Sequence, residues 1–371
     1  MPCAGHPGPS GLTATVCRDT DEFGRLAAEW TALHRRCATA TPFQSHAWLH
    51  SWWLSYGTPG RLRLVLVRRD GVLVAVAPLH RTGGPLPRLT PLGGAITDFS
   101  DVLIADDCPE ALPSLTDALA DLARTAVVEF REVRPDAAVH RVRALWRGPS
   151  RVLPDSVCME LPALPMDRLV ELMPSSKAQR TRAKVRKIDA AGIDRRPVDA
   201  GDVPAALRRL LALHRRQWQG RGVTPEHLTD RFAAHLERSA TAMVADGGAA
   251  MTEFSIDGEL VAADLTLLSP TLSGGYLYGA DPVLRSLKVD VATLLLRNNA
   301  EEASAAGRTT LSMLRGAEPY KNQWYPQLVR NQRLLLARRP YAPAVELLAA
   351  KVRGRIWARD TVRGWQARRQ G

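Results

Sequence analysis

The chain has 371 residues, of which 45% are apolar and 24% are charged. This balance excludes an intrinsically disordered chain, and the length allows about two domains of roughly 100–200 residues each. The 50 Lys and Arg residues outnumber the 38 Asp and Glu residues, which gives a net charge of +12. Such a charge favours acidic partners, such as a nucleotide cofactor, tRNA, an acidic carrier protein or an anionic membrane surface. An Arg-rich proteome explains it equally well.

The cysteines and the N-terminal segment exclude further classes of protein. Five widely spaced cysteines without a CxxC pair predict neither a disulfide framework nor a zinc site, and we expect no metal. The start MPCAGHPGPSG lacks the basic and apolar regions of a signal peptide. No apolar run approaches the ~18 residues needed to cross a bilayer. We therefore expect a cytoplasmic protein without a transmembrane segment, in which residues 1–11 form a disordered tail.

The first half of the chain predicts a domain of helices and strands over residues 12–165. Apolar residues recur at helical spacing in FQSHAWLHSWWLSYG, where Trp48, Trp52 and Tyr56 share one helix face. The runs RLRLVLVRR and VLVAVAPLHR flank an Asp-Gly pair, which predicts a β-hairpin. The strand VVEFREV lies between two further predicted helices. Five prolines between positions 149 and 174 mark the predicted domain connection.

The second half predicts a domain over residues 166–340, followed by a basic helical tail over 341–371. It opens with a basic helical segment, SSKAQRTRAKVRKIDAAG. The period of the apolar residues then changes from 3.6 to two. The segments MTEFSI, ELVAADLTLLS and GGYLYGA predict three antiparallel strands, the first two joined by an Asp-Gly turn. A helix from about 288 to 306 is predicted to end at Gly307, and TTLSMLRG is predicted to be the next strand. The two halves share this order of elements without a residue-level repeat, which indicates a duplicated α/β (α+β) fold.

The predicted helix start after GGYLYGA is the candidate site for an anion. A helix N-terminus offers unpaired N–H groups and a partial positive charge. Arg285, Ser286 and Lys288 flank this start and are the candidates for binding the phosphates of a cofactor. The loop DPVLRSLKVD contains no glycine, although loops that wrap phosphate closely usually contain one. A basic residue near a helix start is also often a simple surface residue.

Seven segments, taken in order, resemble a known family. They are FQSHAWLHSWW, LVAVAPLHR, LGGAITDFSDVLI, SSKAQRTRAKVRKIDAAG, LHRRQWQGRG, YLYGADPVLRSLKVDVATLL and LRGAEPYKNQW. Together they resemble the GNAT-type acetyltransferases associated with cellulose and other polysaccharide biosynthesis, which are similar in turn to the Fem-type aminoacyl transferases. The resemblance covers about residues 43–324.

The resemblance implies two tandem GNAT-like domains, each a mixed, mainly antiparallel sheet flanked by helices. It also implies acyl transfer to an amine or hydroxyl, with the chemistry in the second half. The sequence departs from the family at two places. Leu287-Lys288 stands where the family has Pro-Gly, and Ser312-Met313 stands where the family has Asp-Phe before LRG.

Acyl transfer needs a base, a group that stabilises the oxyanion and an acid for the leaving group. Asp264 lies within the apolar run VAADLTLL and is the predicted base, since a buried carboxyl has a raised pKa or a fixed partner. Its alternative is an Asp that points outward or caps the backbone. Tyr276 and Tyr278 alternate with Leu277 and are expected to share one strand face. One of them could donate a proton to the leaving group or line the acceptor pocket. The alternative is that both are ordinary cross-strand packing residues. Lys321 is predicted to stabilise the oxyanion or bind phosphate, and Tyr320 to position the donor.

The remaining candidates match positions in the family's motifs and are predicted to bind substrate. They are Gln44, Trp48, Asp98, Asp101, Tyr276, Arg315 and Trp324. Ordinary roles are the alternatives. The tryptophans suit a core, the two Asp residues suit turns, and Arg315, Glu318 and Lys321 suit a salt bridge within a loop.

The leading functional prediction is an N- or O-acyltransferase. It would use acetyl-CoA, another acyl-CoA or a carrier-bound thioester, and a small-molecule, saccharide or peptide acceptor. The first alternative is a Fem-like transferase that takes an amino acid from aminoacyl-tRNA through the basic helix at 177–187 and the basic C-terminal segment. Such phosphate contacts weaken steeply with salt. The second alternative is a non-catalytic GNAT-like binding module.

Overall fold

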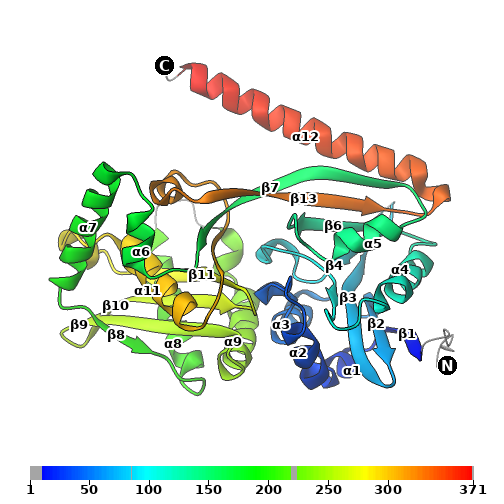
Figure 1. Cartoon of the computed structure of the whole chain (residues 1–371), viewed down its shortest axis with the longest axis horizontal. Helices are drawn as coiled ribbons and strands as arrows, with labels where there is room; N and C mark the ends of the chain where they lie inside the picture. Colours follow the sequence, from blue (N-terminus) through cyan, green and yellow to red (C-terminus); the bar gives the residue numbers. More distant parts are fainter. Residues whose placement is uncertain (1–10, 85, 219–223, 370–371) are drawn as a thin grey trace. The chain divides into compact units, whose positions relative to one another are not determined.

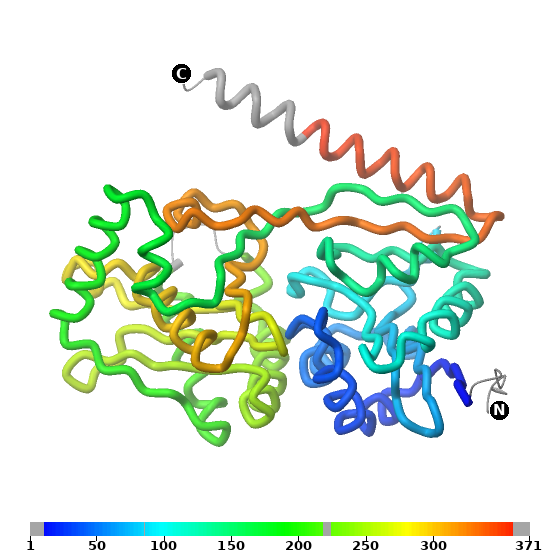
Figure 2. The backbone as a smooth tube through the Cα atoms, viewed as in Figure 1, coloured from blue at the N-terminus to red at the C-terminus, as the bar shows by residue number. Residues whose placement is uncertain are grey.

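The computed structural model describes residues 11–84, 86–218 and 224–369 (Figure 1; Figure 2). The chain divides into two compact units. Unit 1 contains Met1–Phe23, Pro59–Ser156 and Arg330–Gly371, and unit 2 contains Gly24–Thr58 and Val157–Val329. This division differs from the expected ranges 12–165 and 166–340, because the units do not follow chain order. Of the expected tail at 1–11, only Gly11 is among the described residues.

Unit 1 is a mainly antiparallel sheet with helices. Its strands, in spatial order, are β1 (Leu12–Cys17), β2 (Leu62–Arg69), β3 (Val72–Thr82), β4 (Arg88–Pro91), β6 (Val127–Val133), β13 (Gln327–Leu336) and β7 (Ser150–Pro162), with β5 (Leu103–Ile104) beside β3. Its helices are α1 (Thr20–Arg25), η2 (Gly94–Ile96), α4 (Ala111–Leu122), α5 (Val139–Leu145), η5 (Arg339–Tyr341) and α12 (Ala342–Arg369). The predicted hairpin is confirmed: Asp70 and Gly71 both have positive φ, which suits a two-residue turn.

The strands of unit 2 follow in the same sheet order and form a mixed segment: β7, β12 (Thr310–Arg315), β11 (Leu272–Ala280), β10 (Glu259–Leu268), β9 (Ala249–Ile256) and β8 (Asp194–Pro197). The β11–β12 pair is parallel and the other pairs are antiparallel. Its helices from the first part of the chain are α2 (Ala27–Arg35), η1 (Pro42–Gln44) and α3 (His46–Tyr56). Those from the second part are α6 (Met166–Glu171), α7 (Ser175–Asp189), α8 (Val203–Trp218), η3 (Pro225–Leu228), α9 (Asp230–Ala245), α10 (Val283–Ser286), α11 (Val291–Ala305) and η4 (Pro319–Trp324). The three predicted strands 249–280 are therefore confirmed.

The helices of unit 2 cover both faces of its sheet (Figure 1). Tyr278 lies opposite Asp264 in the β10–β11 register, and it packs against the core cluster that contains Leu294 and Leu295 of α11. The next residue, Gly279, points the other way, toward α8. A Cβ at Gly279 would lie 2.6 Å from the backbone oxygen of Leu210. Alternation along β11 thus places α11 and α8 on opposite faces.

The parallel strands β11 and β12 pair over a short distance and then separate. Their register joins Leu272–Gly274 to Thr310–Ser312. Beyond it, Leu314 adopts a positive φ of 57°, and β12 continues against Cys158 of β7. In the part of the chain that the structure describes, the rest of β11 has no partner strand along the edge that faces β12. Two α8 side chains bond to that edge instead: the His214 ring lies 2.7 Å from Tyr278 O, and Gln217 Oε1 accepts from Ala280 N at 3.0 Å.

One local expectation needs correction. The helix predicted from about 288 begins at Val291, because Lys288 has a left-handed backbone and the Asp290 carboxylate caps the helix through Thr293 N. The proline-rich stretch 149–174 contains the boundary between the units, which lies between Ser156 and Val157, and its residues Ser150–Pro162 form the 13-residue strand β7. In the described ranges, no helix combines the length and the apolar composition needed to cross a membrane.

Replacing Gly279 with Ala is expected to destabilise unit 2 by about 2–3 kcal/mol, because the new methyl group would overlap the α8 backbone. Gly201→Ala is the matched control, since a Cβ at Gly201 meets nothing within 4 Å. The thermal unfolding midpoints of both variants check this. Equal midpoints would contradict the close packing of α8 on β11.

Candidate functional site

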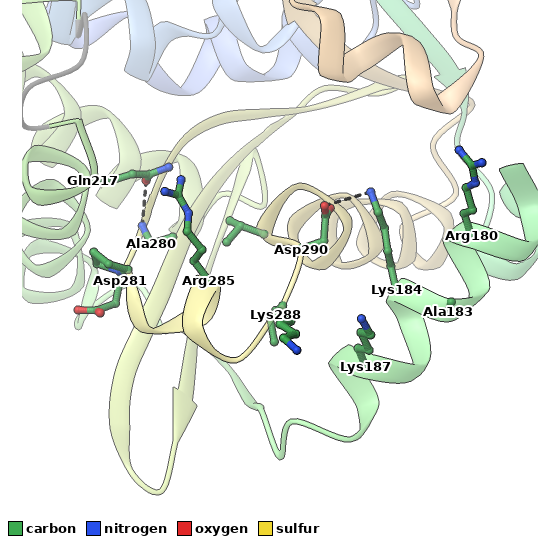
Figure 3. Close-up of a pocket in the computed structure, with 13 residues that line it drawn as sticks. Arg180, Ala183, Lys184, Lys187, Gln217, Ala280, Asp281, Arg285, Lys288 and Asp290 are labelled. Atoms are coloured by element: carbon green, nitrogen blue, oxygen red, sulfur yellow. Dashed lines mark hydrogen bonds and ion pairs between the residues drawn. The ribbon is translucent and has the colours of Figure 1, made fainter.

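A cavity of about 670 Å³ lies in unit 2 where β11 ends and α11 begins (Figure 3). One wall comes from α7, and another from the segment between β11 and α11. Its charged lining residues are Arg180, Lys184, Lys187, Asp281, Arg285, Lys288 and Asp290. Of the four residues predicted to bind the cofactor, Arg285 and Lys288 line this cavity, whereas Ser286 and Tyr320 are not among its lining residues.

The two acidic residues of the cavity are already neutralised. Asp281 pairs with Arg216, and it accepts a hydrogen bond from Val283 N at 2.9 Å. Asp290 lies 3.0 Å from the Lys184 ammonium. Partial burial would raise the pKa of Asp290, but its bonds from Thr293 and Lys184 lower it overall. Asp290 is therefore a carboxylate at neutral pH.

Four cations of the cavity are left without an acidic partner. Within the described chain, no ion pair involves Arg180, Lys187, Arg285 or Lys288, and Figure 3 shows their side chains on the two walls. Cations gathered around one hollow create a positive potential that attracts anions. The N–H groups of the first turn of α11 add a partial positive charge at the same place. The cavity thus suits a ligand with several negative charges.

The backbone at Lys288 explains how the cavity forms without a glycine. Lys288 has φ +58°, a left-handed conformation that glycine adopts with little strain and other residues rarely adopt. The turn is closed by bonds from Lys288 N to Arg285 O at 3.0 Å and from Val289 N to Leu284 O at 2.8 Å. Lysine therefore forms the turn expected of glycine and adds a positive charge to the wall.

The cavity ends at the open edge of β11, next to a tyrosine. Gln217 and Ala280 line the cavity there. Burial raises the pKa of Tyr278 more than the neighbouring Gln217 side chain lowers it, so the phenol keeps its proton at neutral pH. Tyr320 of η4 is half-exposed. Its partial burial, with Tyr278 and Glu318 nearby, raises its pKa to about 12.

Lys321 holds a loop together instead of facing an open space. Its side chain is buried, and its ammonium donates to Arg315 O at 3.0 Å and to Gly316 O at 3.4 Å. It also pairs with Glu318 at 2.8 Å. An ammonium has three protons, and these three acceptors account for them. This arrangement favours the loop salt bridge over a direct role at an oxyanion.

Asp264 lies in the core beneath α11 and is not among the residues that line the cavity. Only 3% of its surface is exposed. Burial raises the pKa of Asp264 to about 8, and the nearby Glu302 acts in the same direction. None of the three predicted catalytic residues lines the cavity, and Tyr278 lies beside the lining residue Gln217.

The predicted acceptor residues of α3 and η1 lie in unit 2. Trp48 is fully buried and packs against Tyr276, with ring centroids 5.0 Å apart, and against His235 at 4.5 Å. Gln44 accepts hydrogen bonds from the N–H of Thr41 at 2.9 Å and from its hydroxyl at 2.8 Å. The contacts of Trp48 and Gln44 are those of a packed core and a helix cap.

The remaining predicted residues are spread over both units. Trp324 is part of the core cluster under α6 and α7. Arg315 ends β12. Asp98 and Asp101 belong to unit 1. There Asp101 is buried and accepts from Ala138 N at 2.7 Å, so it caps the start of α5. The structure therefore does not gather these residues at the cation-lined cavity.

Sequence reasoning missed the cavity roles of Gln217, Arg180 and Lys187. Gln217 gave no local signal, because its role depends on β11 losing its neighbour strand. Arg180 and Lys187 were visible as parts of a basic helix, but only the packing of α7 shows that they face the cavity. In the described ranges, no group of three or more His, Cys, Asp or Glu side chains is placed to hold a metal ion.

Comparison with known proteins identifies the fold. Residues 175–322 match the family described as "Acetyltransferase (GNAT) domain". None of the curated proteins compared matches the chain. The structure of FemX is 13% identical with a TM-score of 0.61, and the match covers 90% of this chain and 99% of that one. A GNAT-like α/β fold with a large, mostly antiparallel sheet is therefore observed.

Two further solved structures are similar at 13% identity. The first is a C-terminal domain (DUF2156) attributed to a lysylphosphatidylglycerol synthetase of Agrobacterium fabrum, with a TM-score of 0.56 over 90% of this chain and 96% of that one. The second is L-PGS from Bacillus licheniformis, with a TM-score of 0.54 over 88% of this chain and 96% of that one. At this identity the likeness concerns the fold alone.

Substitutions at Lys288 separate backbone strain from charge. Lys288→Gly is expected to raise the free energy of unfolding by about 1 kcal/mol relative to Lys288→Ala, because a left-handed backbone costs Ala that much more. Both variants lose the same charge, so both should bind inorganic pyrophosphate equally weakly compared with the unmodified protein. Thermal unfolding and calorimetric titration measure the two effects. Tighter pyrophosphate binding by Lys288→Gly than by the unmodified protein would show that the charge is not what binds.

Proposed function

We propose that the protein is an acyltransferase whose donor, an acyl-CoA or another thioester with several phosphate charges, binds in the cation-lined cavity of unit 2. The observation that carries this proposal is the set of four cations without acidic partners around the start of α11. Phosphate groups suit such a site, because they combine high charge with many acceptor oxygens. The match of residues 175–322 to an acetyltransferase domain supports the same reaction class.

The position of the cavity supports acyl transfer beyond phosphate binding. The cavity runs from the cations to Gln217 and Ala280 at the separated edge of β11. The extended arm of a thioester would bring its acyl group toward this edge. There the acceptor nitrogen or oxygen attacks the carbonyl carbon and the C–S bond breaks. Tyr278 gives its proton to the leaving thiolate, and the proton lost by the acceptor returns to Tyr278 through water.

Aminoacyl-tRNA is the second candidate donor. The observation that favours it is the continuation of positive charge along α7 outside the cavity, where Lys177, Arg182 and Arg186 are exposed. A polyanion longer than a coenzyme would contact these residues as well. The structural likeness to FemX and to L-PGS is compatible with either donor. The acceptor, and a place in polysaccharide biosynthesis, remain predictions from the family resemblance.

Binding measurements distinguish the two donors. Arg285→Ala and Lys187→Ala are each expected to weaken acetyl-CoA binding about tenfold or more, since each removes a charge-assisted hydrogen bond to phosphate. Arg186→Ala, on the same helix but outside the cavity lining, is the matched control and should leave that affinity within about twofold.

Calorimetric titration with acetyl-CoA and a longer acyl-CoA, at low and moderate salt, provides the measurement. Aminoacyl-tRNA is titrated under the same conditions. Absence of any coenzyme A binding would overturn the thioester donor. Salt-sensitive tRNA binding that Arg186→Ala also weakens would then establish the RNA donor.

Tyr278→Phe tests the proposed acid. Removing the hydroxyl is expected to lower kcat about 10²-fold, because the leaving thiolate loses its proton donor, while the donor affinity stays unchanged. Tyr276→Phe is the control on the same strand, and Tyr276 packs its ring against Trp48. Single-turnover acyl transfer to a model amine gives the rate. An unchanged kcat for Tyr278→Phe would remove Tyr278 from the mechanism.

A further inference from the structure

A layer of buried polar side chains lies between the sheet of unit 2 and α11. Asp264 and Thr266 come from β10, and Thr252 lies opposite Asp264 on β9. The members from α11 are Asn298, Asn299 and Glu302. The five residues other than Glu302 are each less than 9% exposed. Burying such a layer in an apolar core costs free energy unless every donor finds an acceptor. We can therefore ask, for each short contact, which group supplies the proton.

The count depends on the hydroxyl of Thr266. Its oxygen lies 2.8 Å from Asn299 Oδ1 and 3.3 Å from Asp264 Oδ2. A hydroxyl has one proton, and an amide oxygen can only accept. The shorter contact therefore uses the Thr266 proton. Asn298 Nδ2 donates to the same Asn299 oxygen at 3.5 Å, which supports this orientation of the Asn299 amide. The contact between Thr266 and Asp264 is then a hydrogen bond only if Asp264 is the donor.

The charges around Asp264 lead to the same assignment. Glu302 Oε1 accepts from Thr252 Oγ1 at 2.9 Å and from Asn298 Nδ2 at 3.2 Å. Arg195 of β8 lies 3.7 Å from Glu302 and also pairs with Glu301 at 2.9 Å. From β11, the titratable group that faces Asp264 is Tyr278. Glu302 therefore has one cation nearby, and that cation is already engaged with Glu301. Among the described residues no ion pair involves Asp264, so one of these two neighbouring carboxyl groups is best kept neutral.

We propose that Asp264 is a neutral carboxylic acid that donates a hydrogen bond to Thr266, whose own proton goes to Asn299 of α11. Through this chain Asp264 positions α11 on the sheet rather than acting as the catalytic base. Because α11 begins with Asp290 and Val291 at the cavity, its seating on β10 sets the shape of the donor site. The expected effect on donor binding rests on the proposed function, whereas the protonation state of Asp264 does not.

Infrared difference spectra of the full-length protein against Asp264→Asn measure the protonation state directly. The expected result is a protonated carboxyl band at about pH 7 that is absent from Asp264→Asn and disappears near pH 8, where the pKa of Asp264 lies. An ionised Asp264 at about pH 7 would overturn the proposal. Glu302→Gln should shift the titration to lower pH, because it removes a negative charge next to Asp264. Glu301→Gln is the neighbouring control and should shift it little, and equal shifts in the two variants would contradict the pairing with Glu302.

The stability and activity of Asp264→Asn provide the second test, because the amide can still donate a hydrogen bond. The folded protein holds a proton on Asp264 that the unfolded chain releases above its ordinary pKa of 3.8. The unfolding midpoint of the unmodified protein should therefore fall relative to that of Asp264→Asn as the pH rises from about 4 to about 8.

At about pH 7, Asp264→Asn should transfer the acyl group within about twofold of the unmodified rate, whereas loss of a general base would cost at least about 100-fold. Above about pH 8, the unmodified protein should lose affinity for acetyl-CoA and Asp264→Asn should not. A rate loss of 100-fold in Asp264→Asn would overturn the proposal. If acetyl-CoA does not bind at all, the proposed function fails, and the infrared titration still decides the state of Asp264.

Discussion

The candidate site depends on the early separation of two parallel strands, β11 and β12. They pair over three residues each, and Gly274 of β11 then packs so closely on Leu314 that a Cβ would lie 2.7 Å from its side chain. Backbone groups left by the separation must find other partners. His214 and Gln217, at the end of α8, bond to two of them. The cavity ends at this edge, so one irregularity in the sheet determines where a ligand can approach Tyr278.

The electrostatics of the cavity follow from which charges are already engaged. Asp281 and Asp290 are each paired with a cation and bonded to a backbone N–H. The cations of α7 and of the turn before α11 then determine the potential. Lys288 contributes both shape and charge, since its left-handed backbone closes the turn and its basic side chain is part of the cavity lining.

A carboxyl within an apolar strand is an ambiguous pattern, because a general base and a neutral buried acid look the same in sequence. The hydrogen-bond partners of the carboxyl in the folded structure distinguish these two cases. The Thr266 hydroxyl beside Asp264 already gives its proton to Asn299, which leaves Asp264 the role of donor in that one contact. Lys321 is a similar case, since its three protons are used by two carbonyl oxygens and Glu318. Both side chains hold elements that shape the site. Of the predicted residues, Arg285 and Lys288 line the cavity, and Tyr278 lies beside the lining residue Gln217.

The sequence by itself determined the local elements and the chemistry of the cavity walls. The Asp-Gly turns, the three strands of 249–280 and the basic residues before α11 are encoded within a few neighbouring residues, where backbone preference and hydrophobic period are sufficient. Tertiary structure alone decided that residues 24–58 pack with the second half of the chain, so that Trp48 contacts Tyr276. It also decided that Gln217 meets the edge of β11 and that Asp264 faces Asn299 and Glu302. These contacts join residues from about 30 to over 200 positions apart in the sequence. Local backbone preference does not specify which distant side chain a buried residue will contact.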